Sequence, residues 1–531
     1  MLQKVVIRNY RVFRDFKLDF TSGMNILVGD NDAGKSTLLE AINLVLTAQL
    51  HGFPAAVELS PYLFNQQATE EYVRELRAGN GPMPPEIVIE AYLTDVKETE
   101  VLRGSNNLCD ENALGVRLKI VFDDTFVEEY QSYVADPGTV NLVPTEYYRV
   151  EWLGFSGSPV KSSRDIPDAS LIDASMIRLQ NGADYYLQQI IGRHLEPGER
   201  VELSRSYRSL REAFSGIEAI GEINTKLGEG HDGITSRRLS LSIDISQRTT
   251  WERTLVPHVD DLPFQFVGNG EQSSLKIMLA LSRKVDDSHI ILVEEPENHL
   301  SFSSLNVLVE KITRKCVGKQ VLVTTHSSYV LNKLGIGNLI LLSPAGGVRI
   351  TELPPDTVDY FRKLPGYDTL RLVLAKRVIL VEGPSDELVI QRAYRDTHDG
   401  RLPIDAGVDV VSVRGLQAKR FLDIAVPLGK PVAVVNDNDG DISTIRAKYV
   451  DYDQHDFVRI CIGEGDERTL EPQMLAANGL ATMNKVLGKS YITNADLLTH
   501  MKNNKTTCAL AVFDSPEPIA MPGYIRDAVA D

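Results

Sequence analysis

The sequence predicts an α/β fold with two units, each built on a parallel sheet. Strand-like apolar runs alternate with helical segments from His289 to Leu342, and a second alternating series begins at Arg377. Such alternation is typical of βαβ units, whose strands lie parallel in one sheet. A glycine-rich loop also joins a short apolar strand, Met24–Val28, to an amphipathic helix over Ser36–Leu46, which is typical of phosphate-binding α/β units.

Length and hydropathy indicate several soluble domains. At 531 residues the chain is too long for one core, and at roughly 150 residues per domain it has room for about three. Apolar residues make up 43% of the chain, but no stretch of 18 residues is uninterruptedly apolar, so we expect no membrane span. The N-terminus leads directly into the strand-like run Val5–Ile7 rather than a secretion signal, which favours a cytoplasmic protein.

Cysteine spacing and charge limit the kinds of site. The formal net charge of −17 argues against a protein coated in basic surface, although a local basic channel for a nucleic-acid backbone is compatible with it. The four cysteines are too far apart for a CxxC zinc site and make a disulfide framework improbable. They are Cys109, Cys316, Cys461 and Cys508.

The chain divides into four segments. Alternating runs at Glu86–Tyr92, Val116–Phe122 and Tyr147–Leu153 predict antiparallel strands. The polar region after them, with helical patterns over Ala183–Leu195 and Ser204–Leu227, carries no catalytic constellation and is interpreted as an insertion, with packing against a partner subunit as one use. A polar, proline-bearing stretch from residue 343 to 365 separates the two parallel-sheet series. The expected segments are therefore 1–160, 161–250, 251–368 and 369–531.

The glycine-rich loop fits the GxxxxGK[ST] pattern of a P-loop. Its glycines let backbone N–H groups surround phosphates, its lysine reaches the outer phosphates, and its serine hydroxyl can hold Mg²⁺. An accidental glycine-rich turn is the alternative, but the preceding strand and the following helix both favour ATP. The expected ATP-binding residues here are Gly29, Asn31, Gly34, Lys35, Ser36 and Thr37.

A second set of expected ATP-site residues follows two later strands. The apolar run His289–Val293 ends in Glu294 and Glu295, where one carboxylate can support the Mg²⁺ shell and the next can orient a water at the γ-phosphate. The run Val321–Thr325 ends in His326, which places an imidazole at the same sheet edge.

Upstream, Gly268 and Gly270 open a glycine-rich signature before a helix over Ser273–Val285. The order of P-loop, signature, paired carboxylates and histidine resembles the ABC ATPase family, and Ile7–Phe13 resembles the start of SMC-like heads. In that family the signature helix completes the ATP site of the opposite subunit, which implies a homodimer. Here the signature is degenerate and Glu294 stands where most members have Asp, which favours ATP binding over rapid turnover.

Acidic residues follow two strands of the second series. Glu382 ends the run from Arg377, and Asp386 lies near the following helix start; Asp437 and Asp439 follow the run Pro431–Val435. Residues i and i+2 on an extended segment project to one side, so these two aspartates can share a metal. Hard oxygen ligands at the carboxyl edge of a parallel sheet suit Mg²⁺ or Mn²⁺. An EF-hand is excluded, because Ile442 occupies its glycine position and Lys448 its glutamate position.

The ordered pair EGxxD and DxD resembles the Toprim domain, and its place behind an ABC-type head resembles the OLD (overcoming lysogenization defect) nuclease family. The resemblance implies an ABC-type ATPase head with a helical insertion, followed by a Toprim domain with a Rossmann-like parallel sheet. It implies metal ligation by Glu471 as well, and it makes Lys505 the candidate active-site lysine, with Lys502 as its rival and a solvated surface lysine as the alternative. Arg414, Lys419 and Arg420 could hold backbone phosphates, although a solvated helix face is the simpler interpretation of each.

These resemblances imply an ATP-regulated nuclease that hydrolyses phosphodiesters, most simply in DNA, with two Mg²⁺ (or Mn²⁺) ions. The implied metal ligands are Glu382, Asp386, Asp437, Asp439 and Glu471, and the implied catalytic residues are Glu382, Asp437, Asp439, Lys505 and Glu295.

Other functions of Toprim and SMC-like proteins fit the sequence less well than a nuclease does. A topoisomerase would need a tyrosine nucleophile domain and a primase a zinc module, and neither fits after Asp439. An ATP-gated DNA clamp or sensor that acts in repair without cutting is the alternative from another class. The resemblance also suggests anti-phage defence, with a helicase or a retron component as partner. The choice between DNA and RNA, and between endo and exo action, stays open.

Overall fold

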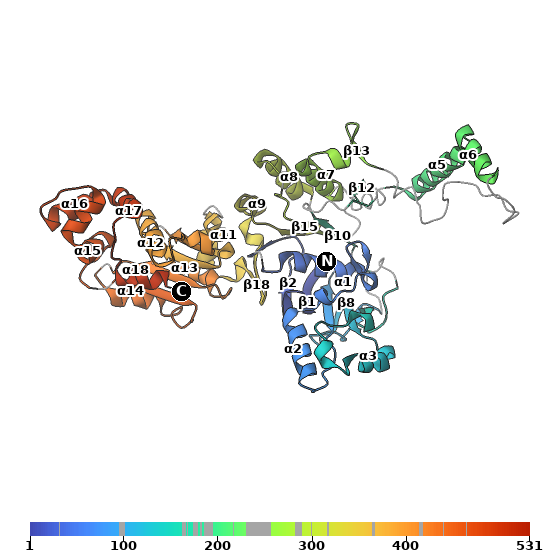
Figure 1. Ribbon diagram of the computed structural model, residues 1–531, viewed down its shortest axis with the longest axis horizontal. Helices are drawn as coiled ribbons and strands as arrows, with labels where there is room; N and C mark the ends of the chain where they lie inside the picture. The colour runs from blue at the N-terminus through green and yellow to red at the C-terminus, as the bar shows by residue number, and fades with distance from the viewer. Residues whose placement is uncertain are drawn as a thin grey trace.

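The structure is a computed structural model of the chain, and Figure 1 shows two bodies that lie side by side, with the N-terminus in one and the C-terminus in the other. Two expected site residues, Asn31 and Asp439, lie outside the described residues. The described residues are 1–30, 32–94, 101–161, 166, 168–173, 179–180, 183–184, 195–215, 217–229, 256–281, 289–298, 300–315, 318–363, 367–413, 418–438, 440–463 and 465–530.

An antiparallel sheet forms one layer of the N-terminal body. Ile7, Ile89 and Leu118 lie opposite one another on three neighbouring strands and are fully buried, so one face of the sheet belongs to the core. The three antiparallel strands predicted from the sequence are confirmed as β6, β8 and β9. The strand order is β2-β1-β6-β8, with β7 and β9 both paired to β8. The strands are β1 (Leu2–Tyr10), β2 (Phe13–Asp19), β6 (Ile87–Leu93), β7 (Arg103–Gly104), β8 (Ala113–Phe122) and β9 (Tyr148–Gly154).

A mostly parallel sheet forms the second layer, in the order β10-β15-β16-β3-β17-β18. Its strands are β3 (Met24–Val28), β10 (Asp168–Asp173), β15 (His289–Glu294), β16 (Gln320–Thr324), β17 (Leu339–Ser343) and the antiparallel β18 (Gly346–Arg349). The strands predicted before the P-loop, before Glu294 and before His326 are confirmed. β10 is a strand that the expectation of a mostly helical insertion did not include, because Asp168–Asp173 pairs with β15 along its whole length. Three of its six residues are polar and interrupt the apolar pattern, which concealed this strand in the sequence.

Helix α1 (Lys35–Thr47) lies between the two sheets. The sequence indicates an amphipathic helix, but Leu38, Leu39, Ile42 and Val45 are fully buried and share one core with strands of both sheets. Most faces of α1 are therefore covered. This enclosure fixes the helix that follows the P-loop.

Other helices cover the far face of the parallel sheet or extend from it. α7 (Asn269–Leu281), α8 (Phe302–Lys315) and α9 (Ser328–Leu334) contribute to the core on that face.

The predicted helix over residues 204–227 is two helices, α5 (Pro197–Ser215) and α6 (Glu218–Glu229), which Figure 1 shows far from the sheets. The predicted helix over 183–195 is wrong at its start, which is a short strand, and its residues 185–194 lie outside the described part of the chain. The remaining N-terminal helices are α2 (Gln66–Arg77) and α3 (Val127–Val134), and two-residue strands are β4 (Gln49–Leu50), β5 (Phe53–Pro54), β11 (Leu179–Gln180), β12 (Ala183–Asp184), β13 (His258–Val259) and β14 (Leu262–Pro263).

The segment between the two bodies is packed. It forms α10 (Pro355–Lys363) and α11 (Tyr367–Leu374), and the rings of Phe361 on α10 and Phe421 on the C-terminal body lie 5.4 Å apart in an edge-to-face arrangement. The polar stretch predicted to separate the two series does lie between the two parallel sheets, and it forms a packed helix there. One apolar core runs from the parallel sheet of the N-terminal body through α10 and α11 to the C-terminal sheet.

The C-terminal body is built on four parallel strands in the order β20-β19-β21-β22, which confirms the second βαβ series. α13 lies on the face that joins the N-terminal core, and α12 and α15–α18 cover the other face. None of the described helices is long and apolar enough to cross a membrane. The elements are β19 (Arg377–Val381), α12 (Pro384–Thr397), β20 (Val408–Ser412), α13 (Ala418–Ala425), β21 (Val432–Asn436), α14 (Ile442–Tyr449), β22 (Val458–Ile462), α15 (Leu470–Leu487), α16 (Asn494–Asn503), α17 (Lys505–Asp514) and α18 (Gly523–Val529).

Candidate active sites

The P-loop turns tightly from β3 into α1. A Cβ atom on Gly29 would lie 2.6 Å from the Leu342 carbonyl oxygen, and one on Gly34 would lie 2.6 Å from the ring of Phe13. Gly34 also has a φ of 85°, which favours glycine. Both glycines are therefore required by the crowded backbone and not only by a ligand.

Three P-loop side chains follow at the start of α1. Thr37 is buried, whereas Ser36 is exposed and can present its hydroxyl to an ion. The buried Lys35 donates from Nζ to the carbonyl oxygens of Gly29 at 3.0 Å and Asp30 at 2.9 Å. Burial lowers the pKa of Lys35, and the neighbouring carboxylates oppose that shift. Phosphate oxygens would be stronger acceptors than these neutral carbonyls, because both partners would be charged.

The carboxyl ends of β15 and β16 bring Glu294, Glu295 and His326 to the P-loop edge of the sheet, since β16 lies between β15 and β3. The backbone N–H of Glu295 donates to the Thr324 carbonyl at 3.1 Å, and its Oε1 lies 3.3 Å from His326 Nε2. Burial and the charge of Lys35 lower the pKa of His326, which keeps the imidazole neutral near pH 7. A neutral imidazole beside Glu295 can donate to a phosphate oxygen.

Glu297 is a residue of this edge to which the sequence assigned no role. Its Oε1 accepts the Thr325 hydroxyl and the His326 N–H, both at 2.7 Å, so it joins the loop after β15 to the loop that carries the histidine. Burial raises its pKa. The sequence signal that could have identified it is a third carboxylate, two residues after Glu295.

The signature glycines lie at the start of α7, which packs on β10 and β15. Gly268 precedes the helix, and a Cβ there would meet nothing within 4 Å. Gln272 in the next turn is buried and donates to the Val267 carbonyl at 2.7 Å, which fixes the turn. Gly268 and Gly270 are thus held on an ordered helix start with open space at Gly268.

The second candidate site lies at the carboxyl edge of the C-terminal sheet. β19 and β21 are neighbours with Leu380 opposite Val434, so Glu382 after β19 and Asp437 after β21 emerge at the same edge. The acidic residues predicted to converge therefore begin from adjacent strands, as expected for a doubly wound sheet.

Two further carboxylates join them from helix starts. Asp386 lies in the first turn of α12, where its Oδ2 accepts the Gly383 N–H at 3.0 Å. Burial, followed by repulsion from Glu382 and Glu471, raises the pKa of Asp386 to about 6. Glu471 in the first turn of α15 is itself buried. Carboxylates from different elements thus act on one another across one site.

Lys505 reaches this cluster. Its Nζ lies 3.4 Å from Glu471 Oε1, and about half of the lysine side chain stays exposed, at 54%. Its rival Lys502 is exposed on the preceding helix, α16. The geometry therefore favours Lys505 as the lysine that can face a bound phosphate.

The donor set fits a hard divalent cation. Among the described residues no three His, Cys, Asp or Glu side chains surround one point that could hold an ion, and Asp439 lies outside them. The described donors are nevertheless carboxylate oxygens whose mutual repulsion an Mg²⁺ or Mn²⁺ ion would relieve. The buried Oδ1 of Asn436, beside Glu382, also receives no hydrogen bond from a described residue. An ion with its water ligands would satisfy such an atom.

Tyr524 and Arg468 are neighbours of the cluster that the sequence did not single out. Burial and the charges of all four described carboxylates, Asp437 first, raise the pKa of the Tyr524 phenol. This buried residue of α18 therefore lies beside the acidic site. The guanidinium of the exposed Arg468 lies against Gly440, 2.9 Å from the place of a Cβ there.

The three cations suggested for phosphate binding are placed differently. Arg414 lies outside the described residues. Arg420 pairs with Asp356 at 3.0 Å and also donates to Thr357, so it joins α13 to α10 rather than facing solvent. Lys419 lies 5.7 Å from the ring centroid of Tyr452. Arg468 is therefore a better-placed candidate for a phosphate contact near the aspartates.

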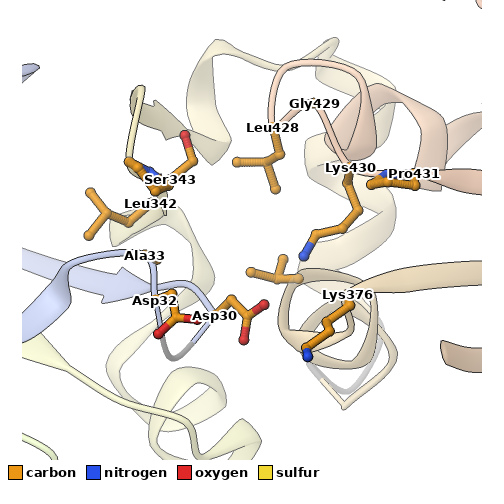
Figure 2. A pocket seen from close by; sticks show the side chains of 12 residues that line it. Asp30, Asp32, Ala33, Leu342, Ser343, Lys376, Leu428, Gly429, Lys430 and Pro431 are labelled. Atoms are coloured by element: carbon orange, nitrogen blue, oxygen red, sulfur yellow. The ribbon is translucent and has the colours of Figure 1, made fainter. Parts of the chain in front are cut away.

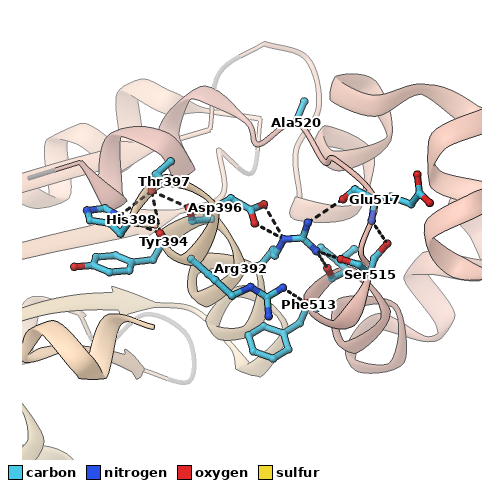
Figure 3. Close-up of polar contacts among 12 residues, drawn as sticks. Arg392, Tyr394, Asp396, Thr397, His398, Phe513, Ser515, Glu517 and Ala520 are labelled. Atoms are coloured by element: carbon cyan, nitrogen blue, oxygen red, sulfur yellow. Dashed lines mark hydrogen bonds and ion pairs between the residues drawn. The ribbon is translucent and has the colours of Figure 1, made fainter. Parts of the chain in front are cut away.

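A buried arginine joins two of the C-terminal helices through hydrogen bonds. Arg392 on α12 donates to both carboxylate oxygens of Asp396, at 2.8 and 2.7 Å, and to the carbonyls of Val512, Ser515 and Glu517. Figure 3 shows this guanidinium between α12 and the segment after α17. Because α17 begins at Lys505, the network helps to fix the helix that carries the candidate lysine.

A cavity of about 310 Å³ lies between the P-loop and the C-terminal body. Asp30 and Asp32 line one side, and Lys376 and Lys430 line the other, as Figure 2 shows. On the C-terminal side, Lys376 and Lys430 precede β19 and β21, so the cavity lies at the edge of the C-terminal sheet opposite Glu382 and Asp437.

Comparison with known proteins agrees with this architecture. Residues 4–118 match a family described as an AAA domain, and residues 257–332 match one described as "AAA domain, putative AbiEii toxin, Type IV TA system". Residues 373–439 match "Overcoming lysogenization defect protein-like, TOPRIM domain". The chain is an ABC-type ATPase fused to an OLD-like Toprim domain. The Toprim match covers β19, α12, β20, α13 and β21, the elements that carry Glu382, Asp386 and Asp437.

Individual relatives are distant. An ATP/GTP phosphatase of Helicobacter pylori is 23% identical over 357 residues, which cover 62% of this chain and 85% of the relative. Endonuclease GajA of Bacillus cereus is 19% identical over 477 residues, 82% of this chain and 74% of that protein. The solved C-terminal region of the Burkholderia pseudomallei OLD protein is 18% identical, covers 29% of this chain and 96% of its own, and superimposes with a TM-score of 0.25.

Proposed function

We propose that this protein is an ATP-regulated, metal-dependent nuclease that hydrolyses phosphodiester bonds, with DNA as its substrate. The observation that carries the proposal is the Toprim site, where Lys505 lies 3.4 Å from the buried Glu471 and burial with neighbouring carboxylates raises the pKa of Asp386 to about 6. Endonuclease GajA, which matches 82% of this chain, supports the same activity.

The carboxylates would divide into two ligand groups. We assign Glu382, Asp437 and Asp439 to one ion and Asp386 with Glu471 to the other. Bound Mg²⁺ or Mn²⁺ would supply an activated water and stabilise the leaving oxygen. The chain itself would bind the scissile phosphate through Lys505, whose ammonium offsets the charge that develops on the phosphate oxygens.

The ATPase domain would act as the regulatory half. We assign Gly29, Asn31, Gly34, Lys35, Ser36 and Thr37 to the phosphates and Mg²⁺, Glu294 to the metal shell, Glu295 to the attacking water and His326 to the γ-phosphate. Gly268 and Gly270 would meet the nucleotide of a second copy, because their helix start is ordered and open space lies at Gly268. The active form is then a homodimer whose heads pair on ATP.

Nicking of supercoiled plasmid tests the proposal. Full-length protein should convert the plasmid to open circles with Mg²⁺ or Mn²⁺ and should fail to do so in EDTA. Glu382→Gln removes one proposed ligand with little change in shape, so it should lower the rate at least about 100-fold. A wild-type protein that cuts neither DNA nor RNA under any metal and nucleotide condition would overturn the nuclease assignment in favour of a clamp.

The cellular role we propose is anti-phage defence in the cytoplasm, with a helicase or a retron component as partner. Its support is the resemblance to OLD-type nucleases. Phage plating on cells with and without the gene and its neighbours would test it, since equal plaque counts in both would contradict a defence role.

A further inference from the structure

Asn436 lies where the two strands of the Toprim site meet. It is the last residue of β21, directly before Asp437, and its Nδ2 donates to Glu382 Oε1 at 3.0 Å. A carboxylate that accepts a hydrogen bond on one oxygen keeps its rotamer and leaves the other oxygen for an ion. The contact therefore joins the carboxylate after β19 to the strand that carries the aspartates.

The rest of the Asn436 amide is enclosed. Its Oδ1 is buried and receives no hydrogen bond from the described residues, and the hydroxyl of the buried Tyr449 on α14 lies beside the same amide. Burial raises the pKa of Tyr449, the Asn436 amide opposes that shift, and Glu382 adds to it. Tyr449, Asn436 and Glu382 thus form one chain of neighbours that leads from α14 to the metal ligands.

We propose that Asn436 is a positioning residue of the nuclease site: its side-chain amide orients Glu382 so that one carboxylate oxygen points to the ion. This inference rests on the proposed function. The atom that faces Glu382 is the amide nitrogen, which donates a hydrogen bond and cannot itself ligate a cation.

Manganese binding to the full chain without nucleotide tests the role, with free Mn²⁺ measured by its electron paramagnetic resonance signal. Asn436→Leu, which keeps the size but removes the amide, should weaken Mn²⁺ binding by about 10-fold to 100-fold, the usual effect of losing a partner of a metal ligand. High Mn²⁺ should restore most of the nicking rate. Ser412→Ala is the matched control, because Ser412 donates to the backbone carbonyl of Glu382 at 3.4 Å and not to its carboxylate.

The control should bind Mn²⁺ within about twofold of wild type. Asn436→Leu that binds Mn²⁺ like wild type, or Ser412→Ala that is equally damaged, would overturn the positioning role. A wild-type chain that binds no Mn²⁺ would instead contradict the proposed function itself. Melting temperatures of all three proteins in EDTA separate weakened binding from misfolding.

A second, independent observation concerns the cavity between the domains. Lys430, on the loop between α13 and β21, extends toward Asp30 of the P-loop (Figure 2) and donates to the Ala375 carbonyl after α11. Asp30 is the residue whose carbonyl holds Lys35. Burial lowers the pKa of Lys430, and the Asp30 charge opposes that shift. The two residues therefore interact across the cavity.

Both ends of this contact lead to an active site. Lys35 must exchange the carbonyls of Gly29 and Asp30 for phosphate oxygens when a nucleotide binds, which changes the bonding at Asp30. At the other end, Lys430 lies two residues before β21, the strand that ends in Asn436 and leads to Asp437. A buried strand transmits a displacement along its length because its core packing leaves little room to absorb it.

We also propose that Lys430 couples the nucleotide state of the P-loop to the Toprim site through Asp30 and β21. This proposal too rests on the proposed nuclease function. Lys430→Met keeps the aliphatic length and removes the charge. Wild-type nicking should change by about fivefold or more on addition of ATP, and that of Lys430→Met by less than about twofold.

Two further measurements make this test specific. Binding of a fluorescent ATP analogue to Lys430→Met should stay within about threefold of wild type, because Lys430 is not one of the residues assigned to the nucleotide phosphates. Lys376→Met, from the same cavity wall, should keep the ATP response. An ATP response of Lys430→Met equal to wild type, or absent in wild type itself, would overturn the coupling while leaving the nuclease assignment intact.

Discussion

The ammonium of Lys505 lies 3.4 Å from a carboxylate oxygen of the buried Glu471, and this pair joins the start of α17 to the acidic edge of the Toprim sheet. Glu471 is buried, whereas Lys505 keeps about half of its surface exposed. In the proposed nuclease, a nucleic-acid backbone would approach Lys505 from solvent, and Glu471 would be one of the residues that hold a metal ion.

Replacement of this lysine should damage catalysis more than folding. Lys505→Ala should lower the nicking rate by about 100-fold to 1000-fold, the usual effect of removing a group that stabilises developing charge. Lys502→Ala should change it by less than about threefold, because Lys502 is exposed on α16. Single-turnover nicking rates measure both, and the reverse ranking would assign the role to Lys502.

The raised pKa of Asp386 predicts a pH-dependent stability in the absence of metal. Because its pKa in the folded chain is about 6, against 3.8 for an unperturbed aspartate, the folded state binds the proton more tightly. Stability from this group is complete below pH 3.8 and is lost as pH rises through about 6, a change of about 3 kcal/mol. Asp386→Asn in EDTA should remove this slope from urea unfolding curves.

Asp441 provides the control for that slope. Hydrogen bonds from Ser443 and Thr444 lower its pKa to about 2, so it stays ionised throughout this pH range. Asp441→Asn should therefore leave the slope between pH 4 and 7 unchanged. A slope that persists in Asp386→Asn would show that another group binds the proton.

Crowding at the P-loop predicts that Gly34 tolerates no side chain. Gly34→Ala places a Cβ atom 2.6 Å from the Phe13 ring at a φ of 85°, so the loop must distort and ATP affinity should fall at least about tenfold. Gly79→Ala has a similar φ of 79° but open space around it, and should cost only about 1 kcal/mol of stability with normal ATP binding. Titration with a fluorescent ATP analogue compares them; equal affinities would contradict the crowding argument.

The Arg392 network predicts a large loss of stability in the Toprim domain. Arg392→Met removes five hydrogen bonds and leaves buried carbonyls without donors, which should cost about 3 kcal/mol or more. Arg395→Met removes the hydrogen bond from Arg395 to the Phe513 carbonyl and should cost about 1 kcal/mol. Limited proteolysis after α17 should follow the same order, and equal resistance of the two variants would contradict it.

The sequence predicted those parts of both sites that depend on short segments. The P-loop, Glu294, Glu295, Glu382 and Asp437 each follow a buried strand directly, so one local pattern suffices to place them at a sheet edge. The same pattern cannot identify Tyr524 or Arg392, which reach their partners only through the packing of distant helices.

The sequence also missed features of the fold that depend on contacts between distant segments. Asp168–Asp173 has an interrupted apolar pattern and becomes a strand because β15 offers it a parallel partner. The polar stretch before α11 contains only a few apolar residues, yet its Val358 and Phe361 are buried in the core that the two domains share. The roles proposed for Asn436 and Lys430 could not be predicted from the sequence, because they depend on contacts in the folded chain. Asn436 lies beside Glu382, and Lys430 lies across the cavity from Asp30.

Nicking rates of supercoiled plasmid with and without ATP, for wild type, Asp437→Asn and Lys35→Ala at saturating Mg²⁺, test the central claim most directly. We predict that Asp437→Asn cuts in neither condition, and that Lys35→Ala cuts at a rate that no longer responds to ATP. Cutting by Asp437→Asn at the wild-type rate, or an undiminished ATP response in Lys35→Ala, would contradict a Toprim nuclease that the ATPase domain controls.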